Sequence, residues 1–416
     1  MSLYQLQHIE TPRLIIRPVQ LGDEFALHES IERSLPALRR WMPWAKDTSF
    51  NATQDFIHRG FAHWKEQTSK DFPLIVIHKE TNTTISVSGF NEHTDLMRPC
   101  FEIGYWIDSS YEGKGLASEL VNALTRYVLE GLQALRAQIC TQVENVKSTA
   151  VAERCGYVFE AKLKNICLDC SSRLPCDGLL FSCCDVTMLP PLEVTWQQNA
   201  AVILKEKKMD EVSAPKEFLR NSEKLPIIQT KRLCLRAPRM QDTEKLYTAL
   251  MASLTEVSPW FSWAKKDLTR RQLQIHVNEG VEAGNDVLGS EHLFFLVWDR
   301  SQQNILGEVW IKVIDWAVPN VLVAYWFDTR HVGNGYAFEA VSAVIRYAFA
   351  KRNAKCIQLY ASEKNIRSLK LAKRLGFLHE GTLRNYFRNF VTDEISAAEM
   401  FSMTEFSQLQ KEELEK

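Results

Sequence analysis

The sequence predicts a mixed α/β fold of the α+β type, present in two similar copies. Short motifs recur in the same order along the chain at an almost constant separation. Within each copy, runs of β-forming residues precede amphipathic helices without strict alternation, which is typical of a mixed sheet flanked by helices. A chain of 416 residues has room for two or three ordinary domains, and an apolar fraction of 45% is enough to fill their cores.

Six motifs of the first half return in the second half. The pairs are Thr11–Arg17 with Thr230–Arg236, Trp41–Lys46 with Trp260–Lys265, Tyr105–Trp106 with Tyr325–Trp326, Gly113–Ala117 with Gly333–Ala337, Asn145–Ser148 with Asn365–Ser368, and Cys155–Tyr157 with Leu375–Phe377. The displacement is 219 residues for the first two pairs and 220 for the others, which is too long for a solenoid repeat. We therefore predict one domain at residues 1–195 and a second at 227–416. A polar connector at 196–226 joins them, helical from about Gln197 to Met209 and ended near Pro215.

Each copy shows the same order of elements. A strand at 13–17 leads into helices that carry the tryptophans, and β-branched and aromatic runs predict strands at 74–77, 84–90 and 101–107. Apolar residues at helical spacing from Leu116 to Val128 predict an amphipathic helix, and a strand at 137–143 precedes a short helix that ends at Gly156. The second copy repeats the pattern at 293–298, 305–311, 321–327, 335–350, 356–361 and 368–375.

A glycine pair stands in each copy where a strand runs into a helix, Gly113–Gly115 in the first and Gly333–Gly335 in the second. Glycines there let the backbone approach a ligand and leave N–H groups free at the helix start, which suits a pyrophosphate. A tight turn without a ligand would also explain the pair. The spacing matches neither the P-loop nor the dinucleotide-binding fingerprint.

Taken together, Thr-x-Arg-Leu-x-x-Arg, Trp-x-x-Trp-Ala, Glu-Ile-Gly-Tyr-Trp-Ile-Asp, Tyr-Glu-Gly-Lys-Gly-Leu-Ala and Asn-x-x-Ser followed by Cys-Gly-Tyr resemble the GNAT acetyltransferases, and most closely their RimJ/RimL-like branch. The resemblance implies a splayed mixed sheet that admits acetyl-CoA, with the pyrophosphate on the glycine turn. The turn departs from the family pattern at its first position in both copies. The cofactor residues it implies are Ile107, Glu112, Gly113, Lys114, Gly115, Leu116, Ala117 and Asn145, and Phe327, Val332, Gly333, Asn334, Gly335, Tyr336, Ala337 and Asn365.

The resemblance also implies catalytic residues. Direct attack of an amine on the thioester requires a base for the amine proton and a donor for the leaving thiolate. Glu102 is the expected base, through a water, although a solvent-facing strand glutamate is the alternative. Ser148 and Ser368 match the serine that donates to the thiolate, with Asn145 and Asn365 beside the pantetheine arm. Simple capping of a helix by the asparagine is the alternative.

The second copy departs from the first at two of these positions. Leu322 stands where Glu102 would be, and Asn334 replaces Lys114 beside the expected pyrophosphate. Glu308 is a possible substitute base, but the sequence favours an edge or surface glutamate there. The first copy is therefore better equipped for chemistry, and the second for binding acetyl-CoA or substrate.

Aromatic residues and cysteines form two further groups. The resemblance places Trp41, Trp44, Tyr105, Trp260, Trp263 and Tyr325 along the acceptor groove, with core packing as the favoured alternative for the tryptophan pairs. Glu160 and Glu380 recur and are expected to be structural. The cysteine cluster does not match a zinc-ribbon spacing, so packing in a hairpin is favoured and no metal is expected. Its members are Cys167, Cys170, Cys176, Cys183 and Cys184.

Charge and hydropathy narrow the class of protein. A net charge of -1 without a basic tract disfavours nucleic acid and anionic membranes as partners. The absence of a signal pattern and of an apolar run of about 18 residues, with ten cysteines, indicates a cytoplasmic protein with reduced thiols. We expect a monomer with packed halves that acetylates a primary amine, in first place a protein N-terminus. A lysine or small-molecule acetyltransferase, or a CoA-binding module with silent halves, is the alternative.

Overall fold

The structure is a computed structural model, and it describes residues 3–66, 71–91, 93–96, 98–198, 223–315 and 318–410. The chain forms two compact units. Among the described residues, the first unit takes 3–163, 167–198 and 383–386, and the second takes 164–166, 223–382 and 387–410. Each unit therefore corresponds to one copy of the repeat, apart from the two short segments 164–166 and 383–386.

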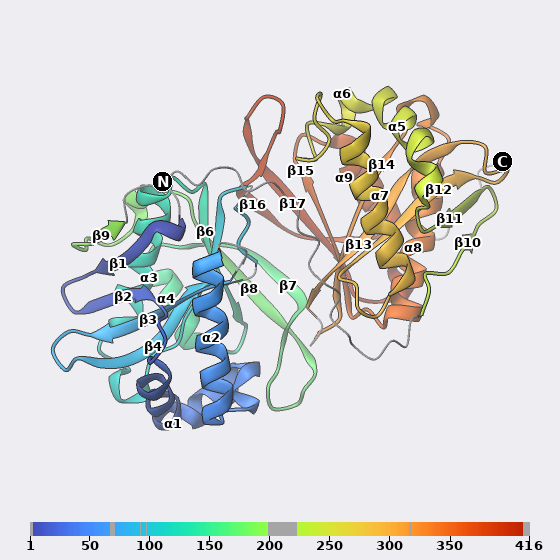
Figure 1. The fold of residues 1–416 in the computed structure, drawn as a ribbon. Helices are drawn as coiled ribbons and strands as arrows, with labels where there is room; N and C mark the ends of the chain where they lie inside the picture. The colour runs from blue at the N-terminus through green and yellow to red at the C-terminus, as the bar shows by residue number, and fades with distance from the viewer. Residues whose placement is uncertain are drawn as a thin grey trace. The chain divides into compact units, whose positions relative to one another are not determined.

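The first copy is a mixed sheet with helices packed against it (Figure 1). Its strands are β1 (Leu6–Glu10), β2 (Leu14–Pro18), β3 (Phe72–His78), β4 (Thr83–Phe90), β5 (Cys100–Gly104), β6 (Arg136–Gln142), β7 (Val158–Leu168), β8 (Pro175–Cys183) and β9 (Thr195–Gln198). Its helices are α1 (Glu24–Trp41), α2 (Phe50–Glu66), α3 (Leu116–Arg126), which continues as a π-helical turn at Tyr127–Gly131, and α4 (Val146–Arg154).

Antiparallel pairing runs from β9 through β1, β2, β3 and β4 to β5. The pair β5 and β6 is parallel, and β8 lies antiparallel between β6 and β7. The parallel pairing covers three positions and its last pair is Glu102 with Gln138. Beyond that pair the strands separate, so backbone groups at the ends of β5 and β6 do not pair with each other.

The second copy repeats this arrangement. Its strands are β10 (Ile228–Gln229), β11 (Leu233–Arg236), β12 (His292–Asp299), β13 (Ile305–Asp315), β14 (Asn320–Phe327), β15 (Cys356–Ser362), β16 (Leu378–Arg388) and β17 (Ile395–Met403), and its helices are α5 (Thr243–Ala252), α6 (Leu254–Val257), α7 (Arg270–Asn285), α8 (Tyr336–Arg352) and α9 (Ile366–Leu375). The parallel pair is β14 with β15, and its last pair is Leu322 with Gln358. The same separation of strands follows in this unit.

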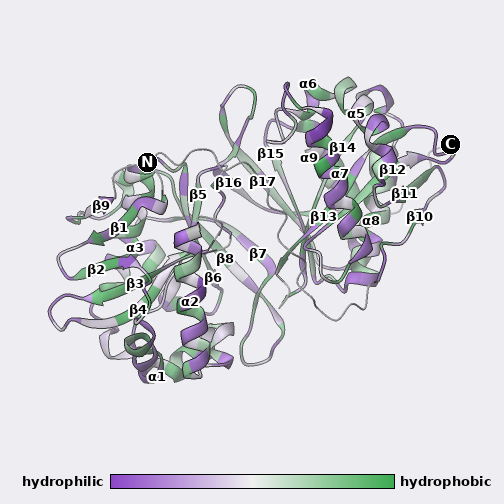
Figure 2. Ribbon diagram, in the orientation of Figure 1, coloured by the Kyte–Doolittle hydropathy of each residue, from purple (hydrophilic) through white to green (hydrophobic). Residues whose placement is uncertain are grey.

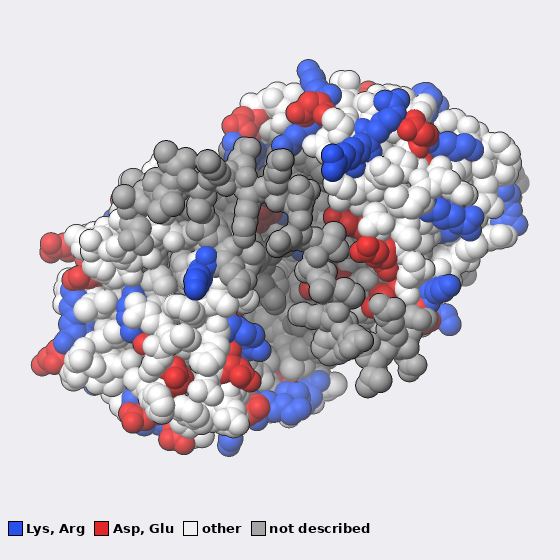
Figure 3. Space-filling model, in the orientation of Figure 1, with Lys and Arg blue, Asp and Glu red and all other residues white. Residues whose placement is uncertain are grey.

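Burial of apolar faces explains these elements. Strands β3 and β12 read as almost continuous runs of buried apolar residues, because helices cover them. In Figure 2, hydrophobic and hydrophilic residues alternate along the helices, as in amphipathic helices. On the face of each unit drawn in Figure 3, basic and acidic side chains are interspersed. None of the described helices is long and apolar enough to cross a membrane.

The mixed α/β fold in two copies, predicted from the sequence, is confirmed. The connector differs from the expectation at its start. Residues 195–198 form strand β9 instead of opening a helix, because they pair antiparallel with β1 and place Trp196 against Tyr127. Residues 199–222, which include most of the helix expected from Gln197 to Met209, lie outside the described residues.

Candidate functional site

Each unit has a turn in which two glycines hold left-handed backbone directly before a helix. Gly113 and Gly115 have φ of 74° and 78°, and Gly333 and Gly335 have φ of 86° and 75°. A Cβ atom at Gly113 or Gly333 would meet no described atom within 4 Å, so the backbone conformation, not the space, favours glycine. Gly115 and Gly335 are the N-caps of α3 and α8, and no described side chain caps either helix. The N–H groups at these helix starts are available to an anion.

A threonine and an arginine hold the glycine turn of the first unit in place. Arg13 donates from Nη1 to the carbonyl oxygen of Lys114 (2.8 Å) and from Nε to Glu119 Oε2 (2.6 Å). Thr11 donates from Oγ1 to Glu119 Oε1 (2.6 Å). Glu119 lies in the first turn of α3 and is buried, so the strand, the turn and the helix are tied together by one carboxylate.

The second unit repeats this arrangement. Arg232 donates from Nη1 to the carbonyl oxygen of Asn334 (2.7 Å) and from Nε to Glu339 Oε2 (2.6 Å). Burial acts to raise the pKa of Glu339, but hydrogen bonds from Thr230 and Arg232 outweigh it, and the pKa is lowered. The Thr-x-Arg-Leu motif that recurs in the sequence is therefore the anchor of the glycine turn in both units.

The charged residues around the two turns differ. In the first unit, Lys114 donates from Nζ to the carbonyl oxygen of Ser110 (2.9 Å), and Lys147 pairs with Glu112 (Nζ to Oε2, 2.6 Å) at the surface. In the second unit, Asn334 donates to the carbonyl oxygen of His331 (3.1 Å) and brings no charge. Arg367 stands at the position of Lys147 and Val332 at that of Glu112, so each turn retains one cation that no carboxylate at these positions neutralises, which favours a phosphate ligand at both.

A tyrosine and a serine face each other where the parallel strands separate. Tyr105 follows the end of β5, and Ser148 lies in the first turn of α4, which follows β6; their hydroxyl oxygens are 2.9 Å apart. Tyr325 and Ser368 form the same pair in the second unit (2.8 Å). Burial raises the pKa of each tyrosine to about 12, so both phenols keep their protons at neutral pH. A protonated tyrosine can donate to the serine, which can then donate onward.

Both asparagines of the Asn-x-x-Ser motif cap a helix. The side chain of Asn145 accepts from the N–H of Ser148 at the start of α4 (3.2 Å), and Asn365 accepts from the N–H of Ser368 at the start of α9 (3.2 Å). The capping expected from the sequence as an alternative is therefore present. It fixes the backbone of each serine, which orients the hydroxyl group toward the tyrosine.

Glu102 lies in the last pair of β5 and β6 and is buried, with 6% of its surface exposed. It is not the solvent-facing residue that was the alternative. Its Oε1 accepts from Asn91 Nδ2 (2.7 Å) and its Oε2 accepts from Gln138 Nε2 (2.7 Å). Two neutral amides hold the carboxylate, and each oxygen retains capacity for a second hydrogen bond.

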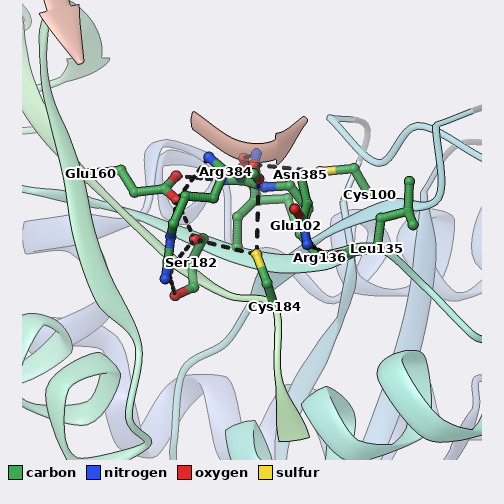
Figure 4. Close-up of polar contacts among 10 residues, drawn as sticks. Cys100, Glu102, Leu135, Arg136, Glu160, Ser182, Cys184, Arg384 and Asn385 are labelled. Carbon is green, nitrogen blue, oxygen red and sulfur yellow. Dashed lines mark hydrogen bonds and ion pairs between the residues drawn. The ribbon is translucent and has the colours of Figure 1, made fainter. Parts of the chain in front are cut away.

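A buried ion cluster supports the start of β6 in the first unit (Figure 4). Arg136, whose side chain is 0% exposed, pairs with Glu160 (Nη2 to Oε2, 2.9 Å) and donates to the carbonyl oxygen of Arg384 (2.6 Å). Glu160 also accepts from Ser182 Oγ (2.6 Å) and from Arg384 Nε (2.9 Å). Buried charges need such partners, so Glu160 has the structural role expected from the sequence. The cluster fixes the strand that carries Gln138, the partner of Glu102.

The second unit has no carboxylate at the position of Glu102. Leu322 pairs with Gln358, and Gln358 Nε2 is buried without a described hydrogen-bond partner. Glu308 is fully buried, so the expectation of an edge or surface residue is wrong. It lies on β13 opposite Trp326 and accepts from His276 Nε2 (3.1 Å) and from Trp326 Nε1 (3.2 Å). Sequence reasoning missed His276 as its partner, because the two residues lie on different elements and share no motif.

The tryptophans have different surroundings. Trp41 is half-buried beneath the guanidinium of Arg40 (4.9 Å), and Trp44 is exposed, with its ring 6.3 Å from that of Trp106. In the second unit, Trp260 contacts Phe387 edge-on, and Trp263 stacks on His276 with ring centroids 5.4 Å apart. Trp44 is thus more accessible than Trp263. A role for these residues in the acceptor groove stays a prediction.

Four cysteines of the cluster lie on the hairpin of β7 and β8, where Cys167 is opposite Cys176 in the strand register, and Cys184 directly follows β8. All ten cysteines are free thiols, and burial raises the pKa of Cys176 to about 12. Within the described part of the chain, no group of three or more His, Cys, Asp or Glu residues is arranged to hold a metal ion. The hairpin thiols pack as small apolar side chains.

Comparison with known proteins identifies the family. The sequence profile described as acetyltransferase (GNAT) domain matches residues 13–158 and again residues 232–378, together well over half of the chain. The chain belongs to the GNAT acetyltransferase family. It carries two such domains in tandem, which confirms the family and the duplication predicted from the motifs.

Individual proteins similar to this chain include curated relatives and a solved structure. A ribosomal-protein-serine acetyltransferase of Escherichia coli is 35% identical over 91 residues, which are 22% of this chain and 50% of the relative. An uncharacterized N-acetyltransferase of Bacillus subtilis, YnaD, is 27% identical over 159 residues, 38% of this chain and 86% of the relative. The chain thus spans about half the length of the Escherichia coli relative. A structure of RimL, a ribosomal L7/L12 alpha-N-protein acetyltransferase, in complex with coenzyme A is 20% identical and covers 43% of this chain and 99% of RimL, with a TM-score of 0.40.

Proposed function

We propose that the protein transfers the acetyl group of acetyl-CoA to a primary amine and that a protein N-terminal α-amine is the favoured acceptor. The observation that carries the proposal is the pairing, in both units, of a left-handed glycine turn at a helix start with parallel strands that separate beside it. The turn suits a pyrophosphate, and beyond the last parallel pair the backbone groups of the two strands no longer bond to each other, so a pantetheine amide could engage them. The relatives named above support the choice of acceptor.

The residues of the first unit fit direct transfer. Ser148, oriented by Asn145 and bonded to the protonated Tyr105, would donate to the sulfur as the thioester breaks. Glu102 has spare acceptor capacity on both oxygens and would take the amine proton through a water molecule. An N-terminal amine has a pKa of about 7.7–8.0, against about 10.4 for lysine, so it needs less assistance from a base near neutral pH.

The second unit would bind acetyl-CoA but would catalyse the transfer less well than the first. Its glycine turn and its Tyr325–Ser368 pair match those of the first unit, but Leu322 replaces the carboxylate. Glu308 is enclosed by His276 and Trp326, and none of its surface is exposed. We therefore infer that the first unit performs most of the transfer.

Mass spectrometry of acetylated peptides tests this function. The protein and acetyl-CoA are incubated with peptides that carry either a free N-terminus or a blocked N-terminus and a free lysine. We expect acetyl groups on the free N-termini, and loss of transfer in Gly115→Glu but much less in Gly335→Glu. Gly22→Glu is the matched control, because Gly22 also has positive φ (103°) and open space at its Cβ position. Transfer to the blocked peptides alone would identify lysine, and not the α-amine, as the acceptor. Absence of transfer to any amine would favour a binding module.

A further inference from the structure

The outer edge of the first sheet is covered by a strand with an aromatic anchor. Strand β9 pairs antiparallel with β1, with Trp196 opposite Ile9. The Trp196 ring packs against Tyr127 at the end of α3, with centroids 5.8 Å apart, and Gln198 donates from Nε2 to the Tyr127 hydroxyl (3.1 Å). The groove between β1 and α3 is therefore filled by backbone pairing and by one large side chain.

The same place in the second unit is an open groove. Among the described residues, β10 pairs with β11 alone, and a groove of about 650 Å³ lies between β10 and α8. Its lining includes Ile228, Phe338, Ala343 and Tyr347. By the displacement of the repeat, Ile228 corresponds to Ile9 and Tyr347 to Tyr127. The groove is thus the counterpart of the one that β9 and Trp196 fill.

A buried hydroxyl in this groove points to a missing hydrogen-bond partner. Ser342 lines the groove with 6% of its surface exposed, and its Oγ has no described hydrogen-bond partner. Its counterpart in the first unit, Asn122, donates from Nδ2 to the carbonyl oxygen of Pro190 (2.9 Å), on the segment that leads into β9. A buried hydroxyl without a partner costs free energy, and an incoming carbonyl group would satisfy it.

The charge of the groove indicates what kind of strand fits. Lys231, Arg346 and Lys351 line it, and no described acidic residue forms an ion pair with any of them. The acidic lining residue, Glu339, is engaged by Arg232. The first unit has uncharged residues at the positions of the two lysines, with Pro12 in place of Lys231 and Gly131 in place of Lys351. An acidic segment therefore complements this groove better than the neutral sequence of β9 would.

We propose that the groove between β10 and α8 binds an extended acidic segment of a partner protein, which adds to β10 as an antiparallel strand. A large aromatic side chain of the segment would lie against Tyr347, as Trp196 lies against Tyr127. In the first unit the Trp196 ring also lies against Gly131, so in the second the Lys351 side chain would have to turn away from such a ring. Strand addition to an open sheet edge derives affinity from the backbone and specificity from side-chain pockets. Residues 411–416, Lys-Glu-Glu-Leu-Glu-Lys, are acidic but hold no aromatic residue that could serve as this anchor.

A charge-reversal experiment with the full chain tests the proposal. The probe is a fluorescent peptide with the sequence of residues 192–198, Leu-Glu-Val-Thr-Trp-Gln-Gln, in which the position of Gln198 is changed to glutamate. In the first unit the Gln198 side chain contacts the Tyr127 hydroxyl, and Gly131 lies four residues further along the same helical face. In the second unit a glutamate at this position would therefore lie within reach of the long Lys351 side chain. We expect saturable binding by anisotropy, weakened about 30-fold when the peptide tryptophan becomes alanine. Lys351→Glu in the protein should weaken binding about fivefold, and a lysine at the Gln198 position of the peptide should restore it.

Control variants distinguish binding in this groove from binding elsewhere on the protein. Lys373→Glu changes the net charge equally on α9, outside the groove, and should leave binding unchanged. Deletion of 411–416 should also leave it unchanged; a tenfold gain in affinity would show that the chain's own tail occupies the groove. Self-association of the free protein that Lys351→Glu abolishes would assign the groove to a second copy. No binding, or binding that Lys351→Glu does not alter, would overturn the proposal. Acetyl transfer to peptides serves as an independent readout and should be unaffected by Lys351→Glu.

Discussion

Replacing His276 with alanine should destabilise the second unit, because it leaves the fully buried carboxylate of Glu308 without an ionisable partner among the described residues. The imidazole donates to both oxygens of Glu308 (3.1 and 3.2 Å), and the remaining donor is the neutral indole of Trp326. Removing one partner of a buried ion pair costs about 3–5 kcal/mol. The His276 side chain is 19% exposed, so we expect the lower end, about 3 kcal/mol.

The effect should depend on pH with a definite sign. Burial acts to lower the pKa of His276, but the charge and hydrogen bonds of Glu308 outweigh it, and the pKa is raised above its ordinary value near 6.5. A raised folded pKa means that the protonated pair contributes its full stability below about pH 6.5 and loses it as the pH rises through the folded pKa. The difference between wild type and His276→Ala should therefore be larger at pH 6 than at pH 9.

Hydrogen exchange of the full chain, measured by mass spectrometry on peptides of α7 and β13, reports the local loss of stability and its pH dependence. The control is His276→Ala combined with Glu308→Gln, which should recover about 1–2 kcal/mol because a neutral amide is cheaper to bury than a carboxylate. A cost of less than about 1 kcal/mol for His276→Ala at every pH would refute the role given to this pair, as would a double variant that is as unstable as the single one.

Three further changes have defined outcomes. Gly156→Ala should lower the free energy of unfolding of the first unit by about 2 kcal/mol, because φ is 73° and the new Cβ would lie 2.1 Å from the carbonyl oxygen of Met188. Calorimetry should show this as a melting temperature lower by several degrees, and an unchanged transition would contradict the packing described. Arg13→Ala should weaken acetyl-CoA binding at the first turn about tenfold, and Arg232→Ala should do the same at the second, because each variant loses a charged hydrogen bond to its turn. Titration calorimetry would measure both effects, and affinities equal to those of the wild type would argue against the anchor. Burial raises the pKa of Cys155 to about 12 and that of Cys183 to about 11, so at pH 8 both should react with iodoacetamide at least ~100-fold more slowly in the folded protein than in urea. Rapid labelling of either thiol in the folded state, seen by mass spectrometry, would mean that it is exposed.

Local patterns made the fold and the cofactor turns predictable from the sequence. Paired glycines at a strand–helix junction, Asn-x-x-Ser at a helix start and a left-handed glycine just after a helix end, at Gly156, each act through neighbouring backbone, so their conformation can be inferred from short motifs. Their repetition in both halves made the duplication evident. The repeated Thr-x-Arg-Leu was also visible, although its partner Glu119 was not.

What the sequence did not predict depends on contacts between distant residues. Asn91 and Gln138 hold Glu102, and His276 encloses Glu308, but nothing in the spacing of these residues brings them together. Sheet register and helix packing decide such contacts. The strand at Thr195–Gln198 was missed for the same reason, because its polar sequence becomes a strand only through pairing with β1.

Titration calorimetry of acetyl-CoA into the full-length protein tests the central claim most directly, since both glycine turns are proposed to hold the cofactor. We predict two binding sites per chain, of which Gly115→Glu removes one and Gly335→Glu the other. A single site, lost in one of these variants and unchanged in the other, would show that one half has the glycine turn but does not bind acetyl-CoA. An absence of binding would contradict the proposed acetyl transfer itself.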